Sequence, residues 1–389
     1  MKIGILTLHN NRNKGSLLQN YCLLKSVEDL FPEATVETLD YRCLSHEFKR
    51  YKNSLVTKQL DAIPARIRDF RLSTEFLSKN CNLTSAKLIS DRYGKAVSFV
   101  NEQNYDLLIF GSDTIWKVTG DYNRRFSGER PFPNVYFGGT QISAEKVAYA
   151  ASANKTDVDR FTGSERHFVT ESLTDFFAIG VRDAHTEDVL RDLDVLDFER
   201  VPDPTFIYDI AQDCNDNKEY RSALASEKPI LGVNTPRNPL ISELVGRFRR
   251  KGYLIVSPNA SPYTDVDFVG EVSPFEYYQL HGEFDFMITD SLHSTIFCLQ
   301  HRTPFITIDL DEKYGNVYSK TKSLLDEFEL LNRHVDGFAI DSREFDVERY
   351  TEISTSESEK IGEILQRHRQ VGRDFLDRTL TAVRTDVND

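Results

Sequence analysis

The sequence predicts a mixed α/β protein with two domains built on mostly parallel sheets. Short apolar runs, each followed by turn residues and then by a helical pattern, recur along the chain, which is typical of βαβ units. The length of 389 residues exceeds the size at which a single hydrophobic core stops growing. A polar stretch divides the apolar runs into two series, so we expect each series to form its own sheet.

The first series begins at the N-terminus with a short apolar run. This run lacks the basic region and cleavage site of a signal peptide, so we expect a strand there. The strands expected in the first half lie at residues 3–8, 107–110, 146–150 and 177–181. In the second half, the dipeptide Lys228-Pro229 restarts the pattern. The strands expected there lie at residues 230–233, 253–256, 286–289 and 305–308.

A linker is expected between the two series. Residues 209–228 are polar and include the run Gln-Asp-Cys-Asn-Asp-Asn, a composition typical of a linker, so the boundary is placed near residue 215. The expected domains span residues 1–215, 216–345 and 346–389. The last of these is helical and charged, and it is expected to pack back on the first domain. A ligand crevice is expected between domains, outside the carboxyl ends of the parallel strands.

Composition excludes several classes of protein. The net charge of −13 opposes nucleic-acid binding, which depends on basic faces, and it requires a local positive pocket for any anionic substrate. No apolar run approaches the roughly 20 residues that a membrane-spanning helix needs. Five cysteines without a Cys-x-x-Cys pair indicate neither a zinc site nor a disulfide scaffold. These features together favour a cytoplasmic protein.

A basic stretch between residues 48 and 80 has two readings. Its cations are Lys49, Arg50, Lys52, Lys58, Arg66, Arg68 and Arg71. Phe70 and Phe76 are interleaved with them. The stretch is either a solvated helical face or a basic arm that touches an acidic glycan or a membrane surface.

Four segments at the ends of expected strands carry the candidate chemistry, because open α/β sheets keep their ligand-binding loops there. The first segment follows strand 3–8 and opens a helix. Gly15 permits close backbone approach, and the amides of the helix start are suited to an anion. A plain helix cap by Asn13 or Ser16 is the alternative. No G-x-G-x-x-G or Walker sequence supports a nucleotide cofactor.

The second segment, residues 105–116, is a strand that runs into a polar turn. Ser112 and Asp113 are candidates to contact a sugar. Trp116, the only tryptophan, either packs in the core or forms a stacking platform.

The third segment ends an apolar strand with Arg182, and arginine is suited to hold a carboxylate or phosphate by two parallel hydrogen bonds. A surface pair between Arg182 and Asp183 is the alternative. His185 is expected to be a surface or capping residue.

The fourth segment, residues 287–297, contains Asp290, Ser291 and His293 after another strand. His293 is the candidate for proton transfer because histidine titrates near neutrality, and a structural histidine is the alternative. Lys313 follows the next strand on the same expected rim, as a site residue or as an ordinary exposed lysine.

Taken together and in matching order, these segments resemble the polysaccharide pyruvyl transferase family. The resemblance is carried by Asn13, Gly15, Leu18 and Gln19 of an N-x-G-x-x-L-Q element; Asp106, Gly111, Ser112, Asp113 and Trp116 of D-x-x-x-x-G-S-D-x-x-W; Tyr149, Ala150, Ala151 and Ser152 of Y-A-A-S; Arg182; Asp203, Pro204 and Thr205 of D-P-T; Asp290, Ser291 and His293 of D-S-x-H; and Pro304 and Lys313.

One position departs from the better known members, in which the histidine element reads R-L-H. Ser291 stands here in place of that arginine, and the D-S-x-H version resembles a large subgroup of the family. Lys320 and Arg302 are the candidates to supply the missing positive charge.

The resemblance implies a fold like that of the GT-B glycosyltransferases, with two Rossmann-like domains facing across a cleft. It implies phosphoenolpyruvate as donor and a saccharide as acceptor, joined as a pyruvate ketal in cell-surface or exopolysaccharide biosynthesis. The implied catalytic residues are His293 as general acid or base, with Arg182 and Lys313 holding the donor. The implied substrate-binding residues are Asn13, Gly15, Ser112, Asp113, Asp290 and Ser291, and the N-terminal domain is the acceptor side. The scheme requires no metal and no cofactor beyond the donor.

Two other functions stay open. A GT-B glycosyltransferase that uses a nucleotide sugar would have the same two domains. A non-catalytic saccharide-binding relative is favoured by Ser291. A lipid-linked acceptor would bring the protein to the inner face of the membrane, and an oligomer is compatible with the sequence.

Overall fold

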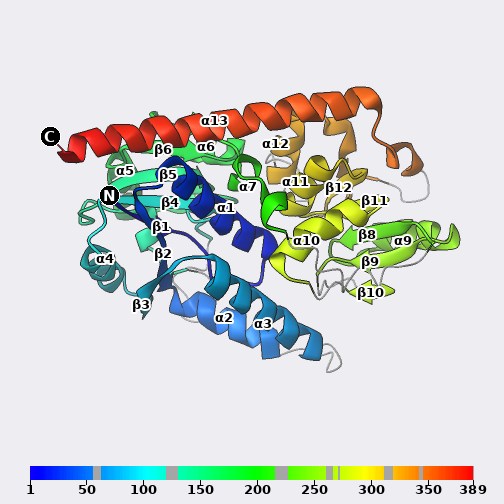
Figure 1. Ribbon diagram of the computed structural model, residues 1–389, viewed down its shortest axis with the longest axis horizontal. Helices are drawn as coiled ribbons and strands as arrows, with labels where there is room; N and C mark the ends of the chain where they lie inside the picture. The colour runs from blue at the N-terminus through cyan, green and yellow to red at the C-terminus, as the bar shows by residue number, and fades with distance from the viewer. Residues whose placement is uncertain are drawn as a thin grey trace. The chain divides into compact units, whose positions relative to one another are not determined.

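A computed structural model describes residues 1–55, 63–119, 130–214, 227–259, 266–269, 272–310, 319–340 and 345–388 (Figure 1). The chain divides into two compact units. Unit 1 comprises Met1–Ile63, Ser73–Tyr208 and His368–Asp389, and unit 2 comprises Pro64–Leu72 and Asp209–Arg367. Each unit contains an all-parallel sheet, which confirms the expected α/β class.

The described part of unit 1 forms a seven-stranded parallel sheet in the order β3-β2-β1-β4-β5-β6-β7. Its strands are β1 (Lys2–Leu6), β2 (Thr35–Arg42), β3 (Leu83–Ile89), β4 (Leu107–Asp113), β5 (Glu145–Ala151), β6 (Ala178–Val181) and β7 (Glu199–Arg200). The strand order reverses between β1 and β4, where Ile3 pairs with Leu107 and Leu6 with Phe110. Loops that leave the carboxyl ends of these two strands therefore flank the position at which open α/β sheets bind ligands.

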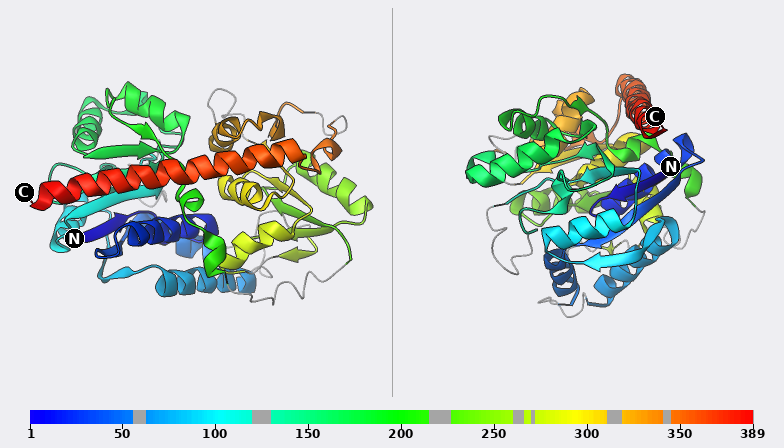
Figure 2. Two further views of the ribbon diagram at one scale, coloured as in Figure 1. Left: turned by 45° about the horizontal axis from the view of Figure 1, so that its top comes forward. Right: turned by 90° about the vertical axis from the view of Figure 1, so that its left-hand side faces the viewer.

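Helices cover both faces of this sheet (Figures 1 and 2). They are α1 (Lys14–Leu30), α2 (Leu44–Leu55), α3 (Ile63–Asn80, shared with unit 2), α4 (Tyr93–Glu102), α5 (Gly163–Thr174), α6 (Ala184–Asp192) and α7 (Pro204–Ile207), with short 3-10 turns η2 (Val135–Phe137) and η3 (Val158–Arg160). Local sequence explains where several of these helices begin. Asn13 caps α1, and Thr162 with Glu165 forms a capping box on α5.

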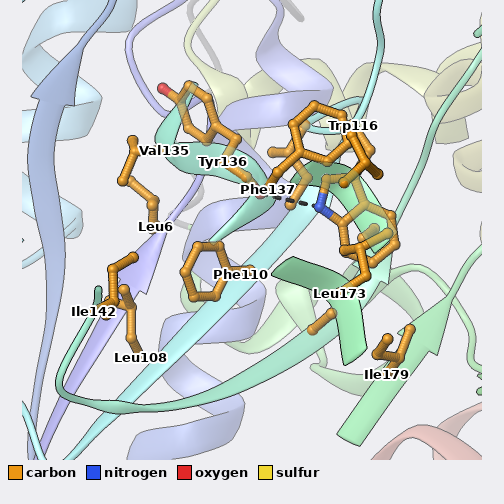
Figure 3. Close-up of a cluster of buried hydrophobic side chains, with 14 of the residues drawn as sticks. Leu6, Leu108, Phe110, Trp116, Val135, Tyr136, Phe137, Ile142, Leu173 and Ile179 are labelled. Atoms are coloured by element: carbon orange, nitrogen blue, oxygen red, sulfur yellow. Dashed lines mark hydrogen bonds between the residues drawn. The ribbon is translucent and has the colours of Figure 1, made fainter. Parts of the chain in front are cut away.

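The core of unit 1 follows from the alternation of side chains along its central strand. In β4, Leu108 and Phe110 belong to one buried cluster, whereas Leu107 and Ile109 belong to another on the opposite face. Figure 3 shows the first cluster, in which Trp116 is buried and its indole Nε1 donates to the carbonyl oxygen of Tyr136 at 3.0 Å. The packing alternative for Trp116 is therefore correct.

The described part of unit 2 forms a six-stranded parallel sheet in the order β10-β9-β8-β11-β12-β13. Its strands are β8 (Ile230–Asn234), β9 (Leu254–Ser257), β10 (Phe268–Val269), β11 (Phe286–Thr289), β12 (Phe305–Asp309) and β13 (His334–Asp336). Its helices and 3-10 turns are η4 (Ile210–Asp213), α9 (Pro239–Arg250), α10 (Pro274–Leu280), η5 (His281–Glu283), α11 (Leu292–His301), α12 (Lys320–Glu327), η7 (Leu331–Arg333) and η8 (Glu348–Tyr350). The order again reverses at one point, here between β8 and β11, as in a Rossmann-like sheet.

The long helix α13 (Thr355–Asn388) is divided between the two units after Arg367. Its second half packs on unit 1, where Phe375, Leu376 and Leu380 join the buried cluster that includes Ile3 and Ile5. Among the helices that the structure describes, none combines the length and the apolar character that crossing a bilayer requires.

All eight expected strands are confirmed, with ends that differ by at most a few residues. The sequence analysis missed β2, β3, β7, β10 and β13. The boundary expected near residue 215 and the residue Lys313 lie outside the described residues.

Candidate functional site

The carboxyl ends of β1 and β4 bring the first two sequence segments together in unit 1. The side chain of Asn13 accepts hydrogen bonds from the backbone amides of Gly15 and Ser16 at 3.1 and 3.3 Å. Ser16 Oγ in turn donates to Asp113 Oδ2 at 2.7 Å. The cap alternative is therefore correct for Asn13, and the two amides that an anion was expected to use already have a partner.

Lys14, which the sequence analysis passed over, is the first residue of α1 and only 1% exposed. Lysine is rarely buried to this degree, and its position brings an amine to the end of the sheet where α1 begins. The sequence did contain an indication of its importance, because Lys14 lies inside the N-x-G-x-x-L-Q element.

Ser112 and Asp113 differ in what they can contact. Ser112 is completely buried, and its carbonyl oxygen accepts from Thr7 Oγ1 at 2.9 Å. Asp113 is half-buried, has a φ of 77° and accepts from the backbone amide of Thr114 at 2.7 Å. Asp113 is thus partly accessible from solvent, whereas Ser112 is enclosed within the turn.

Cations gather around Asp113 in an otherwise acidic chain. Burial and the charges of Arg130, Lys49 and Lys117 lower the pKa of His46 to about 3, while Asp113 opposes that shift. Arg130 Nη2 donates to the carbonyl oxygens of Thr114 and Lys117 at 2.6 and 2.9 Å, which holds the loop after β4. Several cations therefore lie near Asp113 at this end of the sheet.

Arg182 at the end of β6 is 8% exposed and forms a buried ion pair with Asp203, so the alternative of a surface pair with Asp183 is wrong. Its Nη1 donates to Asp203 Oδ2 at 2.9 Å, and Gln19 Nε2 donates to the same oxygen. The other carboxylate oxygen of Asp203 accepts from the amide and hydroxyl of Thr205, so Asp203 also caps α7. The D-P-T and L-Q elements therefore meet at the arginine.

The environment keeps Arg182 charged. Burial on its own would lower the pKa of Arg182, but the charges of Asp203, Asp113 and Asp183 raise it above its ordinary value. Asp183 serves as the cap of α6, where its Oδ1 accepts from the amide and hydroxyl of Thr186.

Several buried polar atoms beside this ion pair lack a hydrogen-bond partner among the residues that the structure describes. They include Nε and Nη2 of Arg182, Oε1 of Gln19 and the hydroxyl of Tyr149. Burial is the main cause that raises the pKa of Tyr149, and the charge of Asp203 raises it further. Buried polar groups are normally satisfied, so unpaired ones clustered around a cation indicate a place for a polar ligand.

In unit 2, Asp290, Ser291 and His293 lie where β11 enters α11. The amide of Asp290 donates to the carbonyl oxygen of Asn234 at 3.3 Å, and the amide of Ser291 donates to Thr289 Oγ1 at 2.9 Å. Surrounding protein atoms and the charge of Asp309 raise the pKa of Asp290 to about 6, although its side chain keeps contact with solvent. His293 is buried in the first turn of α11, with its ring centroid 6.3 Å from that of Phe297.

A network of neutral polar side chains at the same strand ends was missed by the sequence analysis. Asn234 Nδ2 donates to Ser294 Oγ at 2.8 Å, and the hydroxyls of Ser294 and Tyr277 are 2.9 Å apart. Asn259 Nδ2 donates to Asn234 Oδ1 at 3.2 Å. Burial raises the pKa of Tyr277 to about 12, so its phenol stays protonated as a donor. The only sequence signal for this network is that Asn234 ends a strand and Ser294 follows His293.

The two candidates for replacing the missing arginine differ in position. Arg302 caps the end of α11, about 16 Å along the helix from Ser291, and its Nη1 donates to the carbonyl oxygen of Leu299 at 2.6 Å. Lys320 begins α12, and its charge acts on Asp290, whose pKa it lowers against the effect of burial. Lys320 is thus the cation near the D-S-x-H element, and Arg302 is not.

A possible group of metal ligands comprises Asp309, His334 and Asp336 at the ends of β12 and β13. His334 Nε2 is 2.9 Å from Asp309 Oδ2, and its Nδ1 is 3.8 Å from Asp336 Oδ1. A hydrogen bond between His334 and Asp309 is enough to explain this arrangement.

The structure thus assembles two groups of candidate residues, one in each unit. Asn13, Gly15, Asp113 and Arg182 lie at the strand ends of unit 1, and Asp290, Ser291 and His293 lie at those of unit 2. The shared groove that was expected to join them stays a prediction.

The family model of the polysaccharide pyruvyl transferases matches residues 13–312. Among solved structures, a proposed UDP-N-acetylglucosamine 2-epimerase from Listeria monocytogenes has a TM-score of 0.50 at 9% identity, covering 99% of this chain and 96% of that one. A UDP-GlcNAc 2-epimerase from Neisseria meningitidis has a TM-score of 0.47 at 8% identity, covering 94% and 100%. The first likeness shows the GT-B-like fold. No curated protein sequence matches the chain significantly.

Proposed function

Because the chain belongs to the polysaccharide pyruvyl transferase family, we propose that it transfers a pyruvyl group from phosphoenolpyruvate to a saccharide as a ketal. Phosphoenolpyruvate carries a carboxylate and a phosphate, so its binding requires cations inside a protein whose overall charge is −13. The clustering of Arg182, Lys14 and Lys117 at one end of the unit 1 sheet supports this requirement.

The observation that carries the proposal is the incomplete pairing of Arg182. One nitrogen holds Asp203, while Nε and Nη2 are buried without a hydrogen-bond partner in the part of the chain that the structure describes. These two nitrogens form one edge of the planar guanidinium, and such an edge matches the two oxygens of a carboxylate or phosphate. Arg182 would hold the donor by this edge, while Asp203 keeps the side chain in place.

The reaction needs one proton donor and one proton acceptor. A proton adds to the methylene carbon of the donor, a sugar hydroxyl attacks C2, and a second hydroxyl closes the ketal as inorganic phosphate departs. The two hydroxyl protons balance the proton taken up by carbon and the one carried away by phosphate. His293 would move these protons, and Asp290 beside it is half-protonated near pH 6, which suits a group that exchanges protons.

The remaining candidates have supporting roles in this proposal. Lys313 and Lys320 would neutralise the leaving phosphate, since developing charge is best stabilised by cations already in place. Asp113 would accept from acceptor hydroxyls, and Asn13 with Gly15 would hold the loop that carries Lys14. Ser291 would bind substrate through its hydroxyl, and Ser112 would support the turn that presents Asp113.

The test is incubation with phosphoenolpyruvate and a panel of saccharides, scored by phosphate release and by an acid-labile mass increase of the sugar. Arg182→Ala should weaken donor binding by at least tenfold in a thermal-shift titration, and His293→Ala should abolish turnover while donor binding persists. Arg160→Ala, which removes an exposed arginine, is the matched control and should behave as the unmodified protein.

Release of UDP or GDP from nucleotide sugars, with no phosphate from phosphoenolpyruvate, would instead assign the chain to glycosyl transfer. Failure of any phosphoenolpyruvate binding at millimolar concentration would favour a non-catalytic saccharide-binding protein.

A further inference from the structure

Helix α2 exposes a stripe of large apolar side chains. Leu44, Phe48 and Tyr51 are 49%, 47% and 51% exposed. Their spacing of four and then three residues places them on one side of the helix. An isolated exposed leucine is ordinary, but three large side chains in a row along one helix need an explanation.

The orientation of α2 is held by polar contacts of Glu47 and Ser45 with the rest of the protein. Glu47 is buried, lies 3.5 Å from Arg50 and 3.8 Å from Arg42, and accepts a hydrogen bond from Asn10. At the start of the helix, Ser45 donates to Asp91 through its hydroxyl at 2.6 Å. Glu47 therefore anchors α2 against the protein, while Leu44, Phe48 and Tyr51 are held on its exposed side.

The sequence segment that contains this stripe is opposite in charge to the whole chain. Residues 41–80 contain nine lysines and arginines against four aspartates and glutamates, a net charge of +5, while the chain carries −13. Lys49 and Lys52 are exposed on α2 itself. The pattern recurs on α3, where Ile67 is 50% exposed and Arg68 and Arg71 are exposed beside it.

We propose that α2 docks on an anionic lipid surface, with Leu44, Phe48 and Tyr51 entering the boundary between headgroups and acyl chains. Lys49 and Lys52 would then meet the lipid phosphates. A helix that exposes an apolar stripe together with lysines lies in the plane of such an interface, where the lysines are attracted to the lipid phosphates. Because only three apolar side chains enter the lipid, the association is weak and reversible.

The apolar stripe distinguishes this partner from an acidic glycan. A polyanionic sugar chain would use the lysines but would gain little from a phenylalanine and a leucine held in solvent. The tyrosine suits a membrane boundary, where its ring is buried and its hydroxyl stays hydrated.

The experiment is sedimentation of the full-length protein with vesicles of phosphatidylcholine alone and of phosphatidylcholine with phosphatidylglycerol, at low and high salt. The protein should sediment with the anionic vesicles at low salt and much less at high salt or with neutral vesicles. The Phe48→Ser/Tyr51→Ser variant should lose at least tenfold in vesicle partitioning. The matched control is Leu196→Ser/Val371→Ser, which removes two other exposed apolar side chains and should partition as the unmodified protein.

A second pair of variants keeps the test independent of any loss of fold in the first. Lys49→Glu/Lys52→Glu should reduce sedimentation with anionic vesicles at least tenfold, whereas Lys87→Glu/Lys95→Glu, at other exposed lysines, should reduce it far less. Circular dichroism and phosphoenolpyruvate titration of each variant report on folding and on the proposed donor site separately.

Three outcomes overturn the proposal. The first is that the protein stays in the supernatant with every vesicle, and the second is that variants on α2 and their controls partition alike. The third is a different partner for the same face without vesicle binding, seen as α2-dependent binding of soluble polygalacturonate or as a dimer that Phe48→Ser/Tyr51→Ser dissociates.

Discussion

The strand ends of the two units share a topology and differ in chemistry. In unit 1 the reversal of strand order is surrounded by charged side chains, of which Arg182 and Asp203 form a buried ion pair. In unit 2 the corresponding position carries the neutral network of Asn234, Tyr277 and Ser294. The same strand order thus carries an ion pair with charged neighbours in one unit and a neutral hydrogen-bonded network in the other, so the fold alone does not determine the chemistry at its strand ends.

The largest expected effect is on the charged site. Asp203→Ala leaves Arg182 buried without its counter-ion and should destabilise the protein by about 3–5 kcal/mol, because an uncompensated buried charge is costly. Urea unfolding measures the change. Arg191→Ala breaks exposed ion pairs with Glu187 and Asp188 and should cost less than about 1 kcal/mol. Equal effects of the two variants would contradict the distinction.

The next effect concerns a histidine beneath the neutral site. Burial, together with the charges of His301 and His293, lowers the pKa of His281 from 6.5 to about 3. The unfolded chain binds a proton below pH 6.5 and the folded chain does not, so stability is lost as the pH falls from 6.5 towards 3. The contribution is about 2 kcal/mol between pH 6.5 and 5, at 1.36 kcal/mol per unit.

His281→Gln should remove this part of the acid sensitivity, because glutamine does not titrate and its amide is able to replace the contact of the ring with the carbonyl oxygen of Tyr277. Denaturant unfolding at pH 7 and pH 5 gives the comparison. An unchanged difference between the two pH values would show that other groups dominate.

A smaller effect is expected within the neutral network. Ser294→Ala removes the hydroxyl that contacts both Asn234 and Tyr277 and should lower the stability of the protein by about 1–2 kcal/mol. The loss is moderate because two neutral groups lose a hydrogen-bond partner and no charge is left unpaired. Thermal unfolding at pH 7 measures it. A loss as large as that of Asp203→Ala would erase the contrast between the two units.

The smallest effect is expected at Asp290. Its raised pKa means that the folded chain holds the proton up to about pH 6, so stability falls as the pH rises from about 4 through 6. This slope is opposite in sign to that of His281. Asp290→Asn should flatten it, which a series of melting temperatures between pH 4 and pH 8 would detect. A steeper fall in the variant would refute the assigned direction.

The strands predicted from sequence were those whose residues are almost all apolar. Ile3–Leu8 and Leu107–Phe110 were visible because a parallel strand covered on both faces reads as a short apolar run. Strand β2 was missed because Glu37, Asp40 and Arg42 interrupt its sequence. Asp40 is nevertheless buried, with its pKa lowered to about 2, because the hydrogen bonds from His9 and Arg42 outweigh the cost of burial.

The candidate site was predicted by residue type more accurately than by contact. Arg182 was predicted to bind an anionic ligand, with an ion pair to its sequence neighbour Asp183 as the alternative, and the structure pairs it instead with the distant Asp203. Asn13 was recognised and proved to cap α1, while the buried Lys14 beside it was passed over. Burial depends on residues that come from distant parts of the chain, so no local pattern indicates it.

By itself, the sequence determined the α/β class, the position of the main strands and the family, since these depend on local periodicity and on the order of short motifs. Only the tertiary structure decided that Arg182 meets Asp203 and Gln19, and that α2 turns its apolar side outward. The physical reason is that a side chain at the end of a helix or strand has several candidate partners along the sequence. Which of them supplies the counter-charge is settled by the order in which strands pair within the sheet.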